Sequence, residues 1–90
     1  MKRAIVTVVG KDMVGILARV STACAAHGVN VVEVTQSILQ DLFAMIMMVD
    51  VTGCDIPFAG LVDELAALGD EMGLSIHTMH EDIFNTMHHI

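Results

Sequence analysis

The 90-residue chain has no tryptophan and no tyrosine, and only three phenylalanines. It therefore offers little surface for stacking nucleic acid bases. Basic residues are also scarce, because four lysines and arginines stand against eleven acidic residues and leave a formal net charge of −7. Since binding to nucleic acid requires several cations to neutralise phosphates, we expect no nucleic acid partner.

Long apolar runs are also missing. No uninterrupted apolar stretch approaches the ~20 residues of a membrane span, and no basic segment followed by an apolar one opens the chain. The two cysteines, Cys24 and Cys54, lie far apart in the sequence and form no cluster. These features are typical of a protein with reduced thiols, so we expect a cytoplasmic protein that does not bind a membrane.

Apolar side chains are abundant: 54% of the residues are hydrophobic and 17% are charged. A chain of this composition is too apolar to be disordered. Its length suits one domain, residues 1–90, with a single modest core.

The spacing of apolar residues predicts four strands and three helices. Alternation predicts strands at 3–9, 29–39, 42–51 and 74–80, with a bulge near 36–38. Helical spacing predicts one helix from an N-cap at Asp12 to about His27, ended by Gly28, and a second from Pro57 to Gly73. A short terminal helix is expected over 81–90.

This order of elements predicts an α+β fold of the ferredoxin-like βαββαβ type. Right-handed crossovers then give a four-stranded antiparallel sheet of order 4-1-3-2, with both long helices on one face. The strand at 42–51 is apolar on both sides, however. We therefore expect a second subunit, the terminal helix, or both to cover the other face of the sheet.

The most informative segment is the junction from Gly10 to Gly15, where an apolar strand meets a helix. A helix start leaves backbone N–H groups without partners beside the positive end of the helix dipole. Such a junction can hold a small anionic or zwitterionic ligand, but it can equally be an ordinary turn with a capped helix.

Three stretches make the chain resemble the ACT domain, a small ligand-binding regulatory module. They are Gly10-Lys11-Asp12-x-x-Gly15-Ile16, Gly28-Val29-Asn30-Val31, and Gln36-Ser37 with Phe43 to Met48. The sequence is most similar to the stand-alone single-ACT proteins of prokaryotes. The resemblance implies side-by-side pairing of two copies, with an amino acid held between them.

By position, the resemblance implies that the ligand contacts Asp12, Met13, Val14 and Gly15 of one copy and Asn30 of its partner. Members that bind amino acids often have an amide where this chain has Asp12. A carboxylate there repels the carboxylate of a ligand but can receive its ammonium group.

Each of these residues also has a plain structural role. Asp12 can serve as an N-cap, worth ~1 kcal/mol. Gly15 can allow close approach of another strand instead of a ligand, because glycine inside a helix otherwise costs up to ~1 kcal/mol. Asn30 can simply close the turn that follows Gly28.

Metal binding and catalysis are not expected. His77 and His80 point to opposite faces of a strand, and the adjacent His88 and His89 have no known zinc spacing. The eight methionines suit core and interface packing. Small phosphatases share this topology but need an arginine cradle, and Arg3 and Arg19 are the only arginines.

The sequence therefore predicts a non-enzymatic regulatory protein without a cofactor. We expect it to bind a small molecule, an amino acid, as a homodimer. The alternative is a protein-interaction module that regulates a partner protein without binding a ligand. The two hypotheses differ at Asp12 and Asn30, which line a shared cavity in the first and serve only as capping groups in the second.

Overall fold

The computed structural model describes residues 2–11 and 15–87, without the side chains of Leu39 and Met87. It contains one antiparallel sheet and three helices in the predicted order. The strands are β1 (Arg3–Gly10), β2 (Asn30–Leu39), β3 (Leu42–Asp50) and β4 (Ser75–His80). The helices are α1 (Ile16–Ala26), α2 (Phe58–Met72) and α3 (Glu81–Met87).

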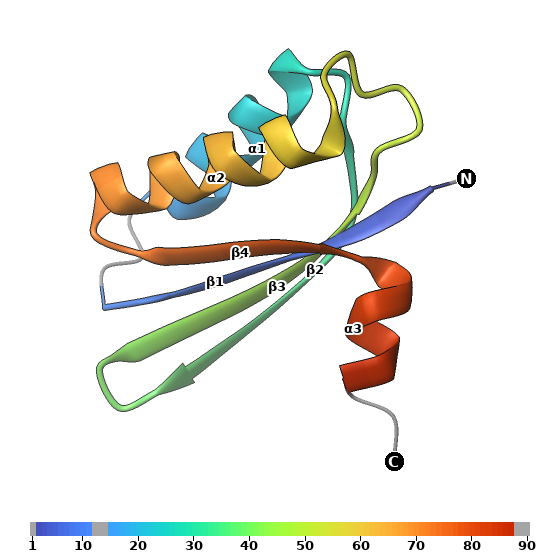
Figure 1. The fold of residues 1–90 in the computed structure, drawn as a ribbon. Coiled ribbons are helices and arrows are strands. Elements are labelled where there is room, and N and C mark those ends of the chain that lie inside the picture. The colour runs from blue at the N-terminus through green and yellow to red at the C-terminus, as the bar shows by residue number, and fades with distance from the viewer. Residues whose placement is uncertain (1, 12–14, 88–90) are drawn as a thin grey trace.

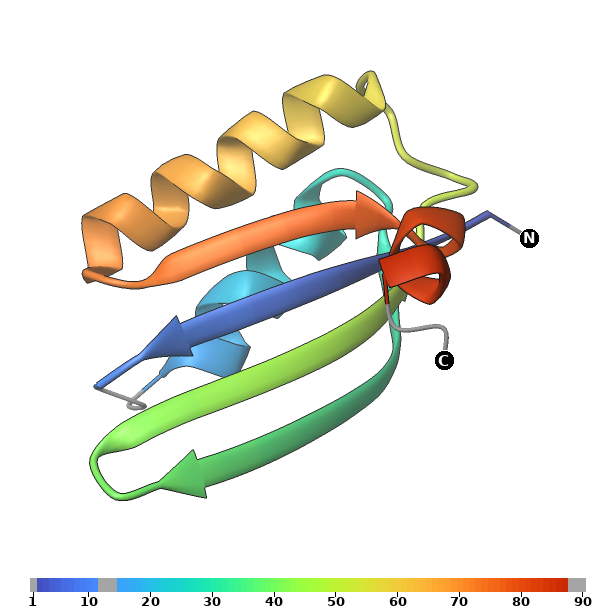
Figure 2. The same cartoon turned by 60° about the horizontal axis from the view of Figure 1, so that its bottom comes forward.

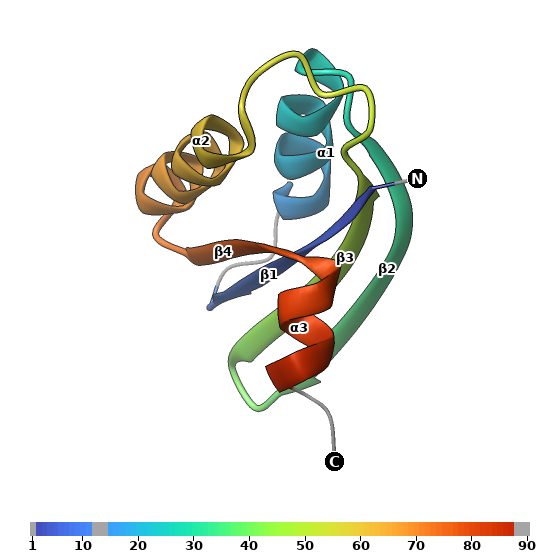
Figure 3. The ribbon, with the colours of Figure 1, turned by 45° about the vertical axis from the view of Figure 1, so that its right-hand side comes forward.

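The sheet has the order β2-β3-β1-β4, so the predicted ferredoxin-like topology is confirmed. Helices α1 and α2 lie side by side on one face, and α3 lies on the other (Figures 1 and 3). An ion pair fixes α3 to the start of β1, because Arg3 Nε donates to Glu81 Oε2 at 2.8 Å. Among the described residues, no helix is long and apolar enough to cross a bilayer.

The core fills the space between the sheet and the two long helices. Alternate residues of β1 and β3 point into it, as their sequence pattern predicts. From the strands it includes Ala4, Val6, Val8, Phe43, Met45, Met47 and Val49, and from the helices Ile16, Val20, Cys24, Leu61 and Leu65. Met45 and Met47 are thus core residues, as expected from their flexible apolar side chains.

The predicted start of the first helix is wrong. Helix α1 begins at Ile16, and its N-cap is Gly15, with φ 74° and ψ 4°. A residue with this left-handed conformation cannot form part of a right-handed helical turn, so the helix starts after it. Asp12 is therefore not the N-cap, and its side chain lies outside the described residues.

The bulge in the second strand is also misplaced. The register between β2 and β3 shifts between Val31 and Glu33, not near residues 36–38. Gln36, Ser37 and Ile38 are all exposed on the edge strand. Because all three are exposed, their polarity does not indicate which face of the sheet each residue occupies. The irregular pattern of apolar and polar residues at 36–38 therefore does not indicate a shift in register.

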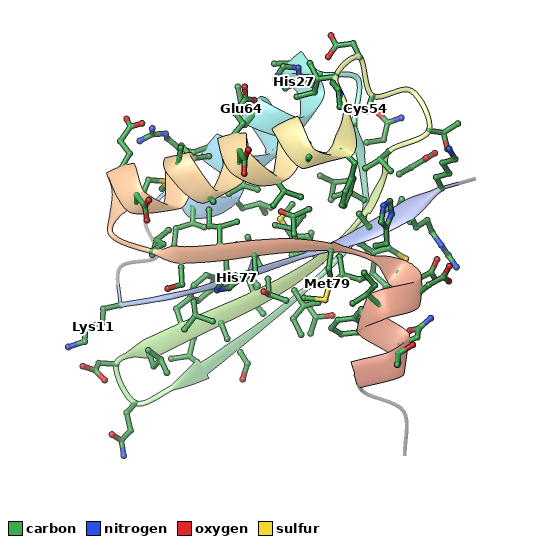
Figure 4. The ribbon with its side chains drawn as sticks, viewed as in Figure 1. Lys11, His27, Cys54, Glu64, His77 and Met79 are labelled. Carbon is green, nitrogen blue, oxygen red and sulfur yellow. The ribbon has the colours of Figure 1, made fainter. Side chains whose placement is uncertain are left out.

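One side chain connects three segments at the top of the helical layer, where Figure 4 shows His27, Cys54 and Glu64 close together. His27 is the C-cap of α1. Its Nδ1 lies 2.8 Å from Asp55 Oδ1, and its Nε2 lies 2.6 Å from Glu64 Oε2 on α2. The hydrogen bond to Asp55, assisted by Glu64, raises the pKa of His27.

We predict that the His27 contacts stabilise the fold more at acidic pH. A neutral imidazole has one N–H and can donate to only one of the two carboxylates, whereas the protonated ring donates to both. Because the pKa is raised in the folded state, this contribution is complete below the unfolded value of ~6.5 and is lost as pH rises through the folded value.

The measurement is urea unfolding of the native chain and of His27→Gln across that pH range. The loss caused by His27→Gln should be larger at pH ~5.5 than at pH ~8.5. His77→Gln, on the exposed side of β4, is the matched control. An equal loss for His27→Gln at both pH values contradicts the role given to the charged ring.

Candidate functional site

The predicted junction lies where β1 ends and α1 begins. Gly10 pairs with Phe43 at the end of the β1–β3 ladder, and Lys11 follows at the surface. Gly15 O then accepts the first helical hydrogen bond, from the Arg19 N–H at 2.9 Å. The other predicted ligand residues of this turn, Asp12, Met13 and Val14, lie outside the described residues.

The two glycines of the junction have different physical roles. A Cβ added to Gly10 would lie 2.0 Å from Leu74 Cδ2, so packing against the start of β4 excludes a side chain there. A Cβ added to Gly15 would meet none of the described atoms within 4 Å. The left-handed backbone at position 15 therefore requires glycine. No described atom of the same protomer occupies the space beside it.

The N-terminus of α1 carries the partial positive charge of a helix dipole. The N-cap glycine provides no side-chain hydrogen bond, and no acidic residue lies in the first helical turn. Lys11 adds a cation whose Nζ lies 3.9 Å from Asp41 Oδ2, with both side chains more than three-quarters exposed. Such a long exposed pair contributes little, so Lys11 remains available to an anionic group.

Asn30 is not part of this cluster within one protomer. It begins β2 opposite Asp50, which on its other side lies opposite Arg3 at the start of β1. The junction follows the opposite end of β1, so Gly10 and Asn30 are separated by about 23 Å along the strands. The structure therefore does not bring Asn30 next to Gly15 within one protomer.

The histidines of β4 lie on opposite faces of the sheet, as predicted. His77 stands opposite Thr7, and His80 stands opposite Ala4, whose side chain is in the core. The His80 ring stacks on Phe58 at the start of α2, with ring centroids 3.9 Å apart. His88 and His89 lie outside the described residues. In the described part of the chain, no three His, Cys, Asp or Glu side chains are arranged to hold a metal ion.

The described cysteines are both free. Cys24 is completely buried on α1, and burial, with a smaller contribution from nearby Cys54, raises the pKa of its thiol to about 11. A thiol with so little thiolate is a poor nucleophile, which argues against a catalytic role for Cys24.

Sequence reasoning missed the contributions of Lys11 and His27. Lys11 was visible as the one lysine inside the glycine motif. The position of His27 just before Gly28 marks it as a helix C-terminal residue, where a cation is favourable. Its partners Asp55 and Glu64 are distant in sequence, and no local pattern connects them to it.

The topology defines a small α+β protein of ferredoxin-like architecture. A family model described as the ACT domain matches residues 4–70, and the chain belongs to this family. A UPF0237 protein of Methanopyrus kandleri is 41% identical over 90 residues, which covers all of both chains. A UPF0237 protein of Bifidobacterium longum is 46% identical, again over the full length of both chains.

Solved structures agree with this assignment. An ACT domain protein from Streptococcus pneumoniae superposes with a TM-score of 0.81 at 35% identity, over 92% of this chain and 93% of that one. The regulatory subunit of aspartate kinase from Thermus thermophilus superposes with a TM-score of 0.63, over 86% of this chain and 50% of that one. At 22% identity, the second likeness shows the fold alone.

We predict that Gly15 is limited by backbone conformation and not by space. Gly15→Ala should lower the free energy of unfolding by about 1 kcal/mol, the cost of a left-handed residue with a Cβ. Gly15→Asn should cost less, because asparagine tolerates this conformation. Urea unfolding measures both.

The matched control is Gly60→Ala in the first turn of α2, where the added methyl makes only ordinary contact with Ile56. It should be neutral or stabilising, by up to about 1 kcal/mol. If Gly15→Ala has as little effect as the control, the left-handed conformation is not a constraint on the folded protein.

Proposed function

We propose that this chain is a non-enzymatic regulatory protein that binds an amino acid between two copies of itself. The observation that carries the proposal is the start of α1, where the N-cap is a left-handed glycine without a side chain and no described atom occupies the space beside it. In this proposal residues 1–90 act as one ACT domain. The two free cysteines favour a reducing compartment, which supports a cytoplasmic site of action.

The chemistry of the junction suits a zwitterion. The N–H groups of the first turn of α1, together with Lys11, attract the carboxylate of an amino acid. Asp12, which precedes them in the sequence, supplies the opposite charge for the ammonium group. In this proposal Met13, Val14 and Gly15 also contact the ligand, and Gly15 permits its close approach to the backbone.

The second part of the site comes from a partner copy. Edge-to-edge pairing of two β2 strands about a two-fold axis runs the two α1 helices in opposite directions. The N-terminus of each α1 then lies near the C-terminus of the other, where Asn30 follows Gly28. Within one copy Gly10 and Asn30 lie about 23 Å apart along the strands. In the paired arrangement, Asn30 of one copy lies near the junction of the other.

The family supports regulation as the role of such a site. This chain covers all of the UPF0237 proteins of Methanopyrus kandleri and Bifidobacterium longum, so these two relatives carry no additional catalytic domain. The aspartate kinase subunit that shares the fold is described as regulatory. If no ligand binds, the same surfaces suit the alternative, a module that regulates a partner protein by contact alone.

The first test is a thermal-shift screen of the proteinogenic amino acids. A ligand at ~100 times its Kd adds ~2.7 kcal/mol of stability, which raises the Tm of so small a protein by roughly 10 °C or more. Divalent metal ions serve as the comparison series. No shift with any amino acid at millimolar concentration contradicts the ligand-binding proposal and favours the alternative.

We predict that Asp12→Asn weakens binding of the amino acid found in that screen. Because Gly15 is the N-cap, this substitution removes no capping residue and should leave the urea midpoint unchanged. Loss of a charged partner should cost ~1.5–3 kcal/mol of binding free energy, measured by calorimetry. Asp41→Asn, at the β2–β3 turn, is the matched control. Equal affinity for native protein and Asp12→Asn excludes a contact with the ammonium group.

A further inference from the structure

The side of the sheet that faces away from α1 and α2 carries exposed apolar side chains. We call it the open face and define it by Val9 on β1 and by Leu42, Ala44, Ile46 and Met48 on β3. These β3 residues alternate with the buried core residues, and Val9 stands opposite Ala44. Leu42, Ile46 and Val9 are 42%, 41% and 39% exposed. Three large aliphatic side chains are therefore left in water on two adjacent strands.

Helix α3 covers only one end of this side of the sheet. Figure 2 looks onto the open face and shows α3 in front of the end near the N-terminus. The helix packs mainly on β1 and β4. Beneath it, Ile5 is 3% exposed although it belongs to the same side of β1 as Val9. The cover stops before Ile46 and Leu42, and α3 itself leaves Ile83 half exposed.

The open face is almost free of charge, in contrast to the rest of the molecule. Its neighbours on the edge strands are small and polar, namely Thr35 and Ser37 on β2 and Ser75 on β4, and Thr7 lies between them. Among the described residues that pair across the strands in line with Ala44, Ile46 and Met48, only Glu33 and His77 can carry charge. The cores of protein interfaces are depleted of charge in the same way.

This charge pattern favours a second copy as the occupant. A molecule of net charge −7 repels another copy wherever acidic side chains meet. On the open face two copies approach with few charged side chains between them. An anionic membrane surface repels the same protein, because both carry negative charge.

We propose that the open face binds the open face of a second copy, with sheet packed against sheet about a two-fold axis. The molecule measures 35 × 34 × 19 Å, so its broad side has room for the ~800 Å² per partner of a standard interface. A shallow hollow of about 180 Å³ between Ile5, Glu33, Thr35, Ile46 and Met48 can receive an aliphatic side chain from the other copy.

Helix α3 determines how the two copies are oriented. It rises from the end of the sheet where β1 starts and β4 ends. A two-fold axis across the strands places the α3 of the second copy at the other end, beyond Leu42 and Val9. The exposed Ile83 of each helix then borders the contact and adds to the apolar surface that is buried.

This contact is separate from the edge pairing of the proposed function, because it uses the flat of the sheet and not the free edge of β2. A molecule with both interfaces assembles into four copies with dihedral symmetry. A molecule with only the open-face contact forms a dimer that has no shared site for an amino acid.

The experiment is sedimentation equilibrium of the native chain and of Ile46→Glu over micromolar concentrations. The substitution places an unpaired carboxylate at the centre of the contact, so it should weaken self-association by about tenfold or more. Ala67→Glu, on the exposed surface of α2, adds the same charge elsewhere and should leave the assembly unchanged. If Ile46→Glu does not fold by circular dichroism, Thr35→Arg, on the exposed surface of β2, replaces it.

The masses distinguish this proposal from the previous one. A native tetramer that becomes a dimer in Ile46→Glu supports both interfaces. A native dimer that becomes a monomer in Ile46→Glu supports the open-face contact and contradicts the edge pairing. A dimer for both proteins overturns the open-face contact and leaves the edge pairing in place. A native chain that remains a monomer overturns both.

Discussion

The packing of β1 and β3 against the long helices determines where the other elements can lie. These central strands bury alternate residues, including Val6 and Met47 at 0% exposure, under α1 and α2. The same strands are apolar on their other side as well, where Ile46 and Val9 are exposed. A single sheet with helices on one face buries only one side of this apolar surface. The position of α3 on the other side of the sheet follows from the apolar surface that remains there, and so does the proposed contact with a second copy.

Much of the fold could be predicted because its determinants are local. Alternation along residues 42–51 specified a strand, and left-handed glycines at Gly28 and Gly73 ended the helices as expected. The errors arose where local polarity does not report conformation. Asp12 has the chemistry of an N-cap, but the left-handed backbone of Gly15 sets the start of α1. On the edge strand β2, exposure on both faces hid the register shift after Val31.

The candidate site was only partly visible in the sequence. Glycine spacing identified the junction from Gly10 to Gly15, and resemblance to the ACT domain added Asn30. Neither shows how far apart these residues lie, since that distance depends on the direction of β1 and on the length of α1. The contacts of His27 with Asp55 and Glu64 were not visible for the same reason, because each joins segments brought together only by the fold.

The proposed function connects ligand binding to assembly. Gly10 and Asn30 lie about 23 Å apart along the sheet of one copy, which is farther than an amino acid can reach. A ligand that contacts both regions must therefore bridge two copies, and by mass action it stabilises the pair that forms its site. Its apparent affinity then depends on protein concentration. The open face lies perpendicular to the β2 edge, so a contact there brings copies together without occupying the site and lowers the concentration at which edge pairing, and hence binding, occurs.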